Sequence, residues 1–260
     1  MILNVDFLSF SYGSVPVLHD ISFSLRSGEL MSVIGPNGVG KSTLFKCILG
    51  TLPGYSGTIT ADGMDMRQLS KRRRAEAVAY IPQIHRPTFG YTVLDTVLMG
   101  VGRQVGTFSQ PKAEHVSIAM DAISRVGVGH LIERDFSRLS GGEQQLVLIA
   151  RAIAQHSGIL VMDEPTSALD YGNQLRVLEL VRSLSDEGYS VLLSTHNPQH
   201  ALSYADTVLA LSGGRTAAYG IPSETVNEEL IRQLYRIDAE FVSSASGDVI
   251  VPKGSVADDV

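Results

Sequence analysis

The chain has 260 residues, a formal net charge of -6 and an apolar fraction of 44%. This composition excludes an intrinsically disordered chain and predicts either one large α/β domain or a main domain with a smaller lobe. The mild acidity argues against a general nucleic-acid-binding surface, which needs a basic face. No apolar stretch approaches the ~20 residues that cross a bilayer, and Met1-Ile2-Leu3-Asn4-Val5-Asp6 lacks the basic start of a signal peptide. Any membrane role is therefore expected to come through a partner.

Apolar patterning in the first third of the chain predicts several strands and one helix. Residues 2–10 alternate apolar and polar side chains, so we expect an edge strand paired in a hairpin with residues 15–25. Residues 30–34 form a short apolar run that ends at a glycine-rich turn, and residues 41–49 follow with helical spacing. Two further short strands are predicted, at 57–59 and 78–81.

Residues 93–156 differ from the rest, because their periodicity is helical and no strand interrupts them. The helices predicted in this stretch are 93–99, 113–126 and 142–155. A helical lobe inserted into an α/β core would produce such a segment.

After residue 156 the pattern returns to continuous apolar runs, which are typical of strands in parallel sheets. The strands predicted there are 158–162, 190–194 and 208–211, with a helix at 173–187. Pro222 to Arg236 predicts one helix that starts at Pro222, residues 241–252 predict a hairpin around Ser246-Gly247-Asp248, and the polar tail is expected to fray. We therefore expect one domain divided into a core at 1–92 and 157–238, a helical lobe at 93–156 and a C-terminal hairpin and tail at 239–260.

A phosphate-binding loop is the clearest chemical motif: Gly35-Pro36-Asn37-Gly38-Val39-Gly40-Lys41-Ser42-Thr43 matches the pattern G-x-x-x-x-G-K-S/T. Its glycines let backbone N–H groups turn toward phosphate oxygens, and the N-terminus of the following helix adds positive potential. Lys41 is expected to reach the β- and γ-phosphates, Ser42 to place its hydroxyl on Mg²⁺, and Thr43 to cap the phosphates. The alternative is a glycine-rich turn with a surface lysine. The strand before the loop and the helix after it favour the phosphate site.

Two carboxylates follow the strand predicted at 158–162, in the run Met162-Asp163-Glu164-Pro165. Ligands bind at the carboxyl ends of strands in open α/β sheets. Asp163 is expected to hold Mg²⁺ through water, and Glu164 to polarise a water that attacks the γ-phosphate. The alternative is a pair that only ends the strand in solvent. The phosphate loop in the same chain favours the catalytic interpretation.

A third motif, Leu139-Ser140-Gly141-Gly142-Glu143, leads into a predicted helix. Ser140 is suited to be its N-cap, and the glycines leave backbone N–H groups exposed, which predicts a second anion site. One chain then has two triphosphate-binding elements for one nucleotide. The economical interpretation is that two chains share each nucleotide.

At these three places the sequence resembles the ATPases of ABC transporters, and Leu-Ser-Gly-Gly is the signature of that family. The resemblance covers nearly the whole chain and implies an α/β fold: a P-loop NTPase core with a mixed, largely parallel sheet, an antiparallel β lobe and an inserted helical lobe. It also implies that Tyr12 stacks on adenine, that Gln83 contacts Mg²⁺ and the attacking water, and that His196 contacts the γ-phosphate. Ser167-Ala168-Leu169-Asp170 resembles the loop that crosses to a second subunit.

In that family two subunits clamp two ATP molecules, so the resemblance implies a homodimer that hydrolyses ATP with Mg²⁺. The implied catalytic residues are Lys41, Gln83, Glu164 and His196, the implied metal-binding residues are Ser42, Gln83 and Asp163, and the implied contacts to the ATP of the partner subunit are Ser140, Gly141, Gly142 and Glu143. Gln144-Gln145 departs from the Gln-Arg or Arg-Gln that usually follows the signature glycines. This departure puts a charge contact near the nucleotide or the partner subunit in doubt.

Three stretches, Tyr91 to Gly100, Phe108 to Pro111 and Asp170 to Gln174, resemble type II importers of bacteria and archaea more narrowly. Those importers take up ferric siderophores, haem, cobalamin and, in one branch, molybdate or tungstate, and the hairpin around Gly247 resembles the siderophore and haem members. The resemblance implies a peripheral subunit on the cytoplasmic face of the membrane, a permease partner and, indirectly, an extracytoplasmic binding protein. It favours a ferric chelate as cargo. An exporter ATPase and a soluble ABC ATPase of translation or DNA repair remain alternatives.

Overall fold

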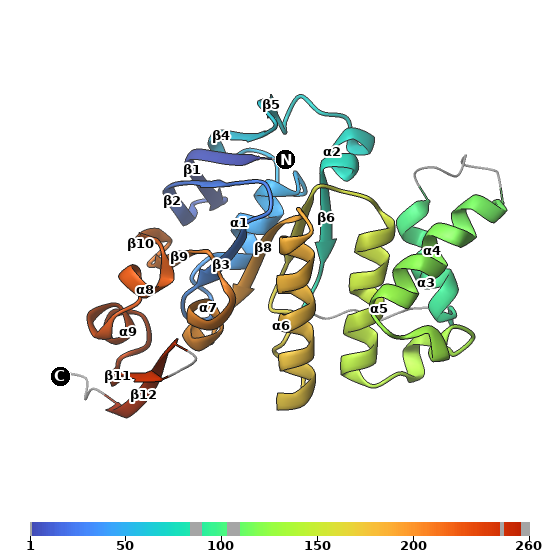
Figure 1. Ribbon diagram of the computed structural model, residues 1–260. Coiled ribbons are helices and arrows are strands. Elements are labelled where there is room, and N and C mark those ends of the chain that lie inside the picture. The colour runs from blue at the N-terminus through green and yellow to red at the C-terminus, as the bar shows by residue number, and fades with distance from the viewer. Residues whose placement is uncertain (1, 84–89, 103–109, 245–246, 256–260) are drawn as a thin grey trace.

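The computed structural model describes residues 2–83, 90–102, 110–244 and 247–255. Figure 1 shows β-sheets and their covering helices on one side of the molecule and a group of helices on the other. Parts of three predicted features lie outside the described residues, namely Phe108-Ser109, Ser246 and the end of the polar tail.

The central sheet has six strands in the order β10-β9-β3-β8-β7-β6. These strands are β3 (Leu30–Ile34), β6 (Val78–Ile81), β7 (Ile159–Met162), β8 (Ser190–Thr195), β9 (Thr207–Ser212) and β10 (Arg215–Gly220). Neighbouring strands run parallel except β9 and β10, which are antiparallel. The carboxyl ends of β3, β8, β7 and β6 therefore lie along one edge of the sheet, which brings together the segments that follow them.

Alternate side chains of a central strand belong to different hydrophobic cores. Ile159 and Val161 of β7 pack with α1 (Lys41–Ile48) and the N-terminal sheet, whereas Leu160 and Met162 pack with the helices that cover the opposite face. Because successive side chains of a strand point to opposite faces, a sheet covered on both sides requires continuous apolar runs.

The N-terminal sheet is antiparallel, with the strand order β2-β1-β4-β5. Its strands are β1 (Leu3–Tyr12), β2 (Val15–Leu25), β4 (Ser56–Ala61) and β5 (Met64–Asp65). Leu44, Phe45 and Ile48 of α1 are fully buried in the core that this sheet shares with the central sheet. Both sheets therefore hold α1 in place (Figure 1), and this packing fixes the direction of its N-terminus.

A helical lobe lies beside the central sheet (Figure 1). Its helices are α3 (Val93–Val101), α4 (Ala113–Arg125) and α5 (Gly141–Ala154), with 3-10 turns at Gly129–Leu131 and Phe136–Arg138. Two flanking helices, α2 (Lys71–Ala77) and α6 (Tyr171–Asp186), precede β6 and β8. None of the helices in the described ranges is long and apolar enough to cross a membrane. The division of the chain into core, lobe and tail remains a prediction.

The C-terminal part contains α7 (Pro198–Tyr204), α8 (Pro222–Thr225), α9 (Glu228–Tyr235) and a two-stranded sheet of β11 (Ile237–Ser244) and β12 (Gly247–Ser255). The prediction of one helix from Pro222 to Arg236 is wrong, because Val226 has an extended backbone. Asn227 then starts α9 as its N-cap and accepts a hydrogen bond from the Leu230 N–H at 2.9 Å.

The predicted hairpin exists but is longer, from Ile237 to Ser255. The helix α7 and the strand β10 have no predicted counterpart. The other predicted strands and helices are confirmed to within two residues at their ends.

Candidate functional site

The phosphate loop joins β3 to α1. Gly35 has a φ of 147°, and a Cβ there would lie 2.5 Å from the carbonyl oxygen of Leu211, so only glycine fits. Gly40 is the N-cap of α1 and provides no capping side chain, and the first turn of α1 has no acidic residue. The N–H groups at this helix N-terminus can therefore bind an anion, and the loop suits a chain of phosphates.

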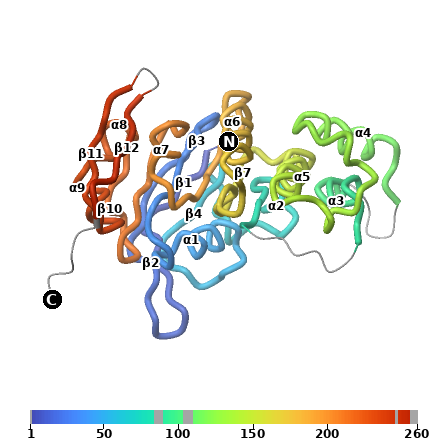
Figure 2. Tube along the Cα trace, turned by 90° about the horizontal axis from the view of Figure 1, so that it is seen from below, coloured from blue at the N-terminus to red at the C-terminus, as the bar shows by residue number. Residues whose placement is uncertain are grey.

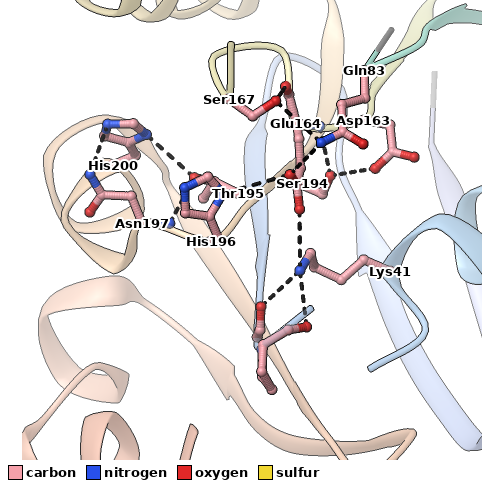
Figure 3. Close-up of polar contacts among 12 residues, drawn as sticks. Lys41, Gln83, Asp163, Glu164, Ser167, Ser194, Thr195, His196, Asn197 and His200 are labelled. Carbon is pink, nitrogen blue, oxygen red and sulfur yellow. Dashed lines mark hydrogen bonds and ion pairs between the residues drawn. The ribbon is translucent and has the colours of Figure 1, made fainter. Parts of the chain in front are cut away.

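Lys41, the first residue of α1, is buried. Its Nζ donates to the carbonyl oxygens of Gly35 at 2.8 Å and Pro36 at 3.2 Å. The same nitrogen lies 3.5 Å from Oε1 of Glu164 (Figure 3). These contacts hold the ammonium group beside the phosphate loop, where it supplies positive charge.

Glu164 is the point at which several predicted site residues meet (Figure 3). Its Oε2 accepts a hydrogen bond from Nε2 of Gln83 at 2.9 Å and lies 3.6 Å from Nδ1 of His196. Gln83, Glu164 and His196 follow the neighbouring strands β6, β7 and β8. The Glu164 side chain is 12% exposed, whereas that of His196 is 53% exposed. One carboxylate thus has an ammonium, an amide and an imidazole around it, an arrangement that can orient and polarise water.

Asp163 is buried beside Glu164 and is held by two hydroxyl groups. Its Oδ1 accepts from Oγ of Ser194 at 2.8 Å, and its Oδ2 accepts from the Tyr80 hydroxyl at 3.5 Å. Burial, together with the charge of Asp163, raises the pKa of Tyr80 to about 12, so the phenol stays protonated. Ser194 also accepts from the Glu164 N–H at 2.9 Å. One serine therefore fixes both acidic residues.

A pocket of about 380 Å³ adjoins the phosphate loop. It is lined by Asn37, Gly38, Gly40, Lys41, Ser42, Thr43, Gln83 and Glu164. The Ser42 hydroxyl and the Gln83 side-chain amide offer oxygen donors, which Mg²⁺ prefers. Asp163 is not among the lining residues, and its contact to Mg²⁺ through water stays a prediction. The donor set fits Mg²⁺ that is bound mostly by phosphate and water.

The signature segment has a complete capping box at the start of α5. Oε2 of Glu143 accepts from the N–H and from the hydroxyl of Ser140, both at 2.8 Å, and these bonds hold the pKa of Glu143 below its ordinary value. Oγ of Ser140 accepts from the Glu143 N–H at 3.4 Å. None of Ser140, Gly141, Gly142 and Glu143 lines the pocket at the phosphate loop of the same chain. Their role toward a second chain stays a prediction.

The N-terminus of α5 contacts the predicted dimer loop and the start of α6. A Cβ at Gly141 would lie 3.6 Å from the carbonyl oxygen of Ala168, and a Cβ at Gly142 would lie 2.7 Å from the side chain of Asn173. Asp170 caps α6 and accepts from the N–H and the side-chain amide of Asn173 at 3.0 and 2.6 Å. A larger residue at position 142 would therefore require the Asn173 side chain to move.

Tyr12 is predicted to contact a nucleotide, and the loop that begins at Ser167 is predicted to contact a second subunit. Tyr12 is 46% exposed, packs edge-to-face on Phe10 at 4.9 Å, and does not line the pocket at the phosphate loop. Ser167 bonds back into its own site, accepting from Nε2 of Gln83 at 3.3 Å and donating to the Glu164 carbonyl at 3.1 Å. The adenine contact of Tyr12 and the reach of residues 167–170 to a second subunit both remain predictions.

The departure at Gln144-Gln145 has a structural explanation. Nε2 of Gln144 donates to the carbonyl oxygens of Phe136 at 3.1 Å and Leu139 at 3.2 Å, which braces the signature segment. Gln145 is only 6% exposed and lies in the lobe, so it does not offer a surface contact to a nucleotide or partner.

Sequence reasoning missed four residues around the site, namely Tyr80, Ser194, Asn197 and His200. A hydroxyl in an otherwise apolar, buried strand needs a hydrogen-bond partner, and this signal was present at Ser194. Asn197 followed by Pro198 is a typical helix start, since Asn caps and Pro occupies the first helical position.

The fold and the pocket define a P-loop protein that binds a nucleoside triphosphate. The family model described as ABC transporter matches residues 18–167, which is more than half of the chain. The hemin import ATP-binding protein HmuV of Thermobifida fusca is 36% identical over 243 residues, covering 94% of this chain and 85% of the relative. A probable iron chelatin transport ATP-binding protein of Helicobacter pylori is 37% identical over 213 residues, covering 81% and 84%.

Solved structures agree with these relatives. An inward-facing metal-chelate type ABC transporter matches with a TM-score of 0.85 and 31% identity, over 97% of this chain and 96% of that one. A nucleotide-free ATP-binding cassette from an ABC transporter matches with a TM-score of 0.77 and 26% identity, over 90% and 94%. The chain belongs to the ABC transporter family, and its activity is ATP hydrolysis.

Proposed function

We propose that a homodimer of this chain energises a bacterial or archaeal importer of a metal chelate, with a ferric siderophore or related iron complex as the cargo. The convergence of Lys41, Gln83 and His196 on Glu164 carries the motor role. The cargo rests on relatives named for hemin import and for iron chelatin transport, and on the metal-chelate type structure. These similarities favour an importer over an exporter or a soluble ABC ATPase. Haem, cobalamin and molybdate or tungstate are the alternative cargoes.

Triphosphate binding follows from the phosphate loop. The N–H groups at the N-terminus of α1 and the ammonium of Lys41 present positive potential to the β- and γ-phosphates. Lys41 exchanges its bonds to two backbone carbonyls for stronger, charge-assisted bonds to phosphate oxygens. When bound, Mg²⁺ neutralises charge on the phosphates. Ser42 and Gln83 are the residues that would hold it, with Asp163 acting through water.

Hydrolysis follows from the contacts of Glu164. The side-chain amide of Gln83 orients the Glu164 carboxylate. This carboxylate accepts a hydrogen bond from a water molecule and takes up the proton of that water as the water oxygen attacks the γ-phosphorus. His196 is exposed on the same side and donates to the γ-phosphate. The bond from the γ-phosphorus to the ADP oxygen breaks, and ADP and phosphate leave. The chain contributes mainly positioning and charge stabilisation.

A second copy of the chain supplies the other half of each site in this proposal. The signature residues lie outside the pocket of their own chain, and the N-terminus of α5 is suited to bind the phosphates of a nucleotide held by a partner. An interface that forms only with ATP bound converts binding energy into closure, and hydrolysis reverses it. The closing dimer would act on permease subunits from the cytoplasmic face of the membrane, and an extracytoplasmic binding protein would deliver the cargo.

The variant Glu164→Gln tests the motor role. We expect Mg-ATP turnover to fall by about 10²–10⁴-fold, since a general base is lost, while ATP binding persists and a dimer accumulates in sedimentation with Mg-ATP. Glu179→Gln, on the exposed face of α6, is the matched control and should hydrolyse ATP like the unaltered chain. Equal turnover in the two variants would remove Glu164 from its assigned role.

The same variant tests the cargo in cells. Cells that carry only the Glu164→Gln chain should stop taking up radiolabelled ferric siderophore, while uptake of the other three cargoes persists. Loss of haem, cobalamin or molybdate uptake instead would reassign the cargo and leave the motor role intact. If uptake of all four cargoes persisted in these cells, the importer proposal would be contradicted.

A further inference from the structure

The switch loop, defined here as Thr195 to Asn197, contains His196, but the His196 side chain does not fix the position of the loop. The His196 side chain is 53% exposed and approaches Glu164 at 3.6 Å. Its neighbours on either side, by contrast, are hydrogen-bonded to the first turn of α7 (Figure 3). The place of His196 therefore depends on α7.

His200, one turn into α7, contacts both neighbours of His196. Its Nδ1 lies 3.4 Å from Oγ1 of Thr195, and its Nε2 lies 3.1 Å from Nδ2 of Asn197. Oδ1 of Asn197 accepts from the Gln199 N–H at 3.0 Å, which makes Nδ2 the donor to His200 and places the imidazole proton on Nδ1. Oγ1 of Thr195 also accepts from the Asn197 N–H at 3.1 Å. These hydrogen bonds link Thr195, Asn197 and His200 in a ring, and the His196 side chain is not part of it.

Gln199 connects α7 to the C-terminal hairpin. Its Nε2 donates to the carbonyl oxygen of Asp248 at 3.0 Å, and its Oε1 accepts from the Ile250 N–H at 2.9 Å. The side-chain amide therefore pairs with β12 as the backbone of a neighbouring strand would. Figures 1 and 2 both show α7 beside this hairpin. In the sequence, Gln199 immediately precedes His200, which bonds to the first and the last residue of the switch loop.

The junction that leads into the hairpin lines a pocket together with His196. This pocket has a volume of about 620 Å³. The other lining residues are Pro36 and Asn37 of the phosphate loop, Ser212, and the α9–β11 junction Gln233, Leu234, Tyr235 and Arg236. Arg236 turns the chain from α9 into β11 with a left-handed φ of 55°. The hairpin thus begins at a junction that lines the same pocket as the phosphate loop, and it is bonded to α7 through β12.

We propose that the C-terminal hairpin is a positioning element for His196 and that Gln199 is the residue through which it acts. This inference rests on the proposed contact of His196 with the γ-phosphate. The hairpin holds α7, and α7 holds the switch loop through Asn197 and His200. His196 then stands at a fixed place with its imidazole available to the nucleotide. Loosening the hairpin should slow hydrolysis without weakening the phosphate loop.

Gln199→Leu is the test, because leucine has a similar size and makes neither hydrogen bond to β12. In the full chain we expect kcat for Mg-ATP hydrolysis to fall by about tenfold, since misplacing a catalytic group by ~1 Å costs up to about 10²-fold. ADP affinity should not change, because ADP lacks the phosphate that His196 contacts. Amide hydrogen exchange should accelerate at Asn197 and Gln199 but not in residues 30–45.

Two further variants make the test specific. Gln199→Glu keeps the acceptor for the Ile250 N–H but loses the donor to Asp248, so its kcat should lie between those of Gln199→Leu and the unaltered chain. Lys253→Met removes the 2.8 Å ion pair to Glu240 on the same hairpin and should leave kcat unchanged.

An unchanged kcat in Gln199→Leu would overturn the inference. So would a parallel loss of kcat and ADP affinity, or faster exchange throughout the chain, because either result indicates general destabilisation. Failure of the proposed function is recognised separately: His196→Ala would then hydrolyse ATP as fast as the unaltered chain, which also removes the basis of the inference.

Discussion

At Ser194, one buried hydroxyl serves two acidic residues. It donates to Asp163 at 2.8 Å and accepts from the Glu164 N–H at 2.9 Å. Glu164 has a φ of 46°, a left-handed conformation that costs about 1–2 kcal/mol in a residue other than glycine. The hydrogen bond to Ser194 offsets part of this cost and directs the carboxylate toward Lys41 and Gln83.

Ser194→Ala should lower the free energy of unfolding by about 1–3 kcal/mol, because a buried carboxylate and a buried N–H each lose a partner. Turnover of Mg-ATP should also fall, since Glu164 loses its orientation. Urea unfolding and steady-state hydrolysis measure the two effects. Ser185→Ala is the control: this serine is also buried and donates to the Gly28 carbonyl at 3.0 Å, so its loss should affect stability alone. Equal turnover in the two variants would contradict the role given to Ser194.

Among individual residues, the sequence predicted those that contact a nucleotide better than those that orient the contacting residues. Lys41 and Glu164 stand in motifs whose spacing reflects their chemistry, and the structure brings them to 3.5 Å. Ser194 acts on Asp163 only because β7 and β8 pair with Met162 opposite Leu193. Such a register depends on long-range packing, which no local pattern encodes.

Among the elements, α7 contains a histidine, His200, whose protonation changes the free energy of unfolding. Burial, and then the charge of His196, lower the pKa of His200, while the unfolded chain keeps the ordinary value near 6.5. As the pH falls through that value the unfolded chain binds the proton first, so His200 contributes stability above pH 6.5 that is lost on acidification.

We therefore expect the free energy of unfolding to decrease more steeply between pH 7.5 and about 5.5 in the unaltered chain than in His200→Gln, which has no proton to bind. Urea unfolding at a series of pH values measures the two slopes. Identical slopes would show that His200 does not resist protonation in the folded chain.

Other elements show where patterns were insufficient. The apolar spacing from Pro222 to Arg236 continues across Asn227, yet the Asn227 side chain caps α9 and α8 ends before it. Asn competes with helical backbone bonds, so capping prevailed over periodicity. The strand β10 was missed because Arg215–Gly220 has small and polar residues and depends on pairing with β9.

For the whole molecule, the motifs and the family resemblance predicted the fold class but not the order of the strands in the central sheet. Each central strand is apolar on both faces, so its residues do not reveal its neighbours. The order β10-β9-β3-β8-β7-β6 emerges from α1 packing on one face and the helical lobe on the other. This order places Gln83, Glu164 and His196 after the ends of the adjacent strands β6, β7 and β8, and the site therefore depends on the sheet.

The close approach of Gly142 to Asn173 joins the signature helix to the segment that follows Glu164 in the same chain. In the proposed dimer, the contact between Gly142 and Asn173 would then connect the helix end that closes on one nucleotide to the segment that follows Glu164, the residue that hydrolyses the other. The two nucleotides would be linked through the interior of each chain as well as across the interface. Such linkage is reciprocal, and in the proposed dimer, whose interface forms only with ATP bound, occupancy of one site would favour occupancy of the other.

Hydrolysis should consequently rise with ATP concentration with a Hill coefficient above one. Asn173→Ala removes the side chain that meets Gly142, while Asp170 still caps the backbone N–H of α6, so the coefficient should fall toward one with kcat largely retained. Glu179→Ala, on the exposed face of the same helix, should keep the coefficient of the unaltered chain. A hyperbolic dependence of the hydrolysis rate on ATP concentration in the unaltered chain would mean that the two sites act independently. The glycine at position 142 would then serve packing alone.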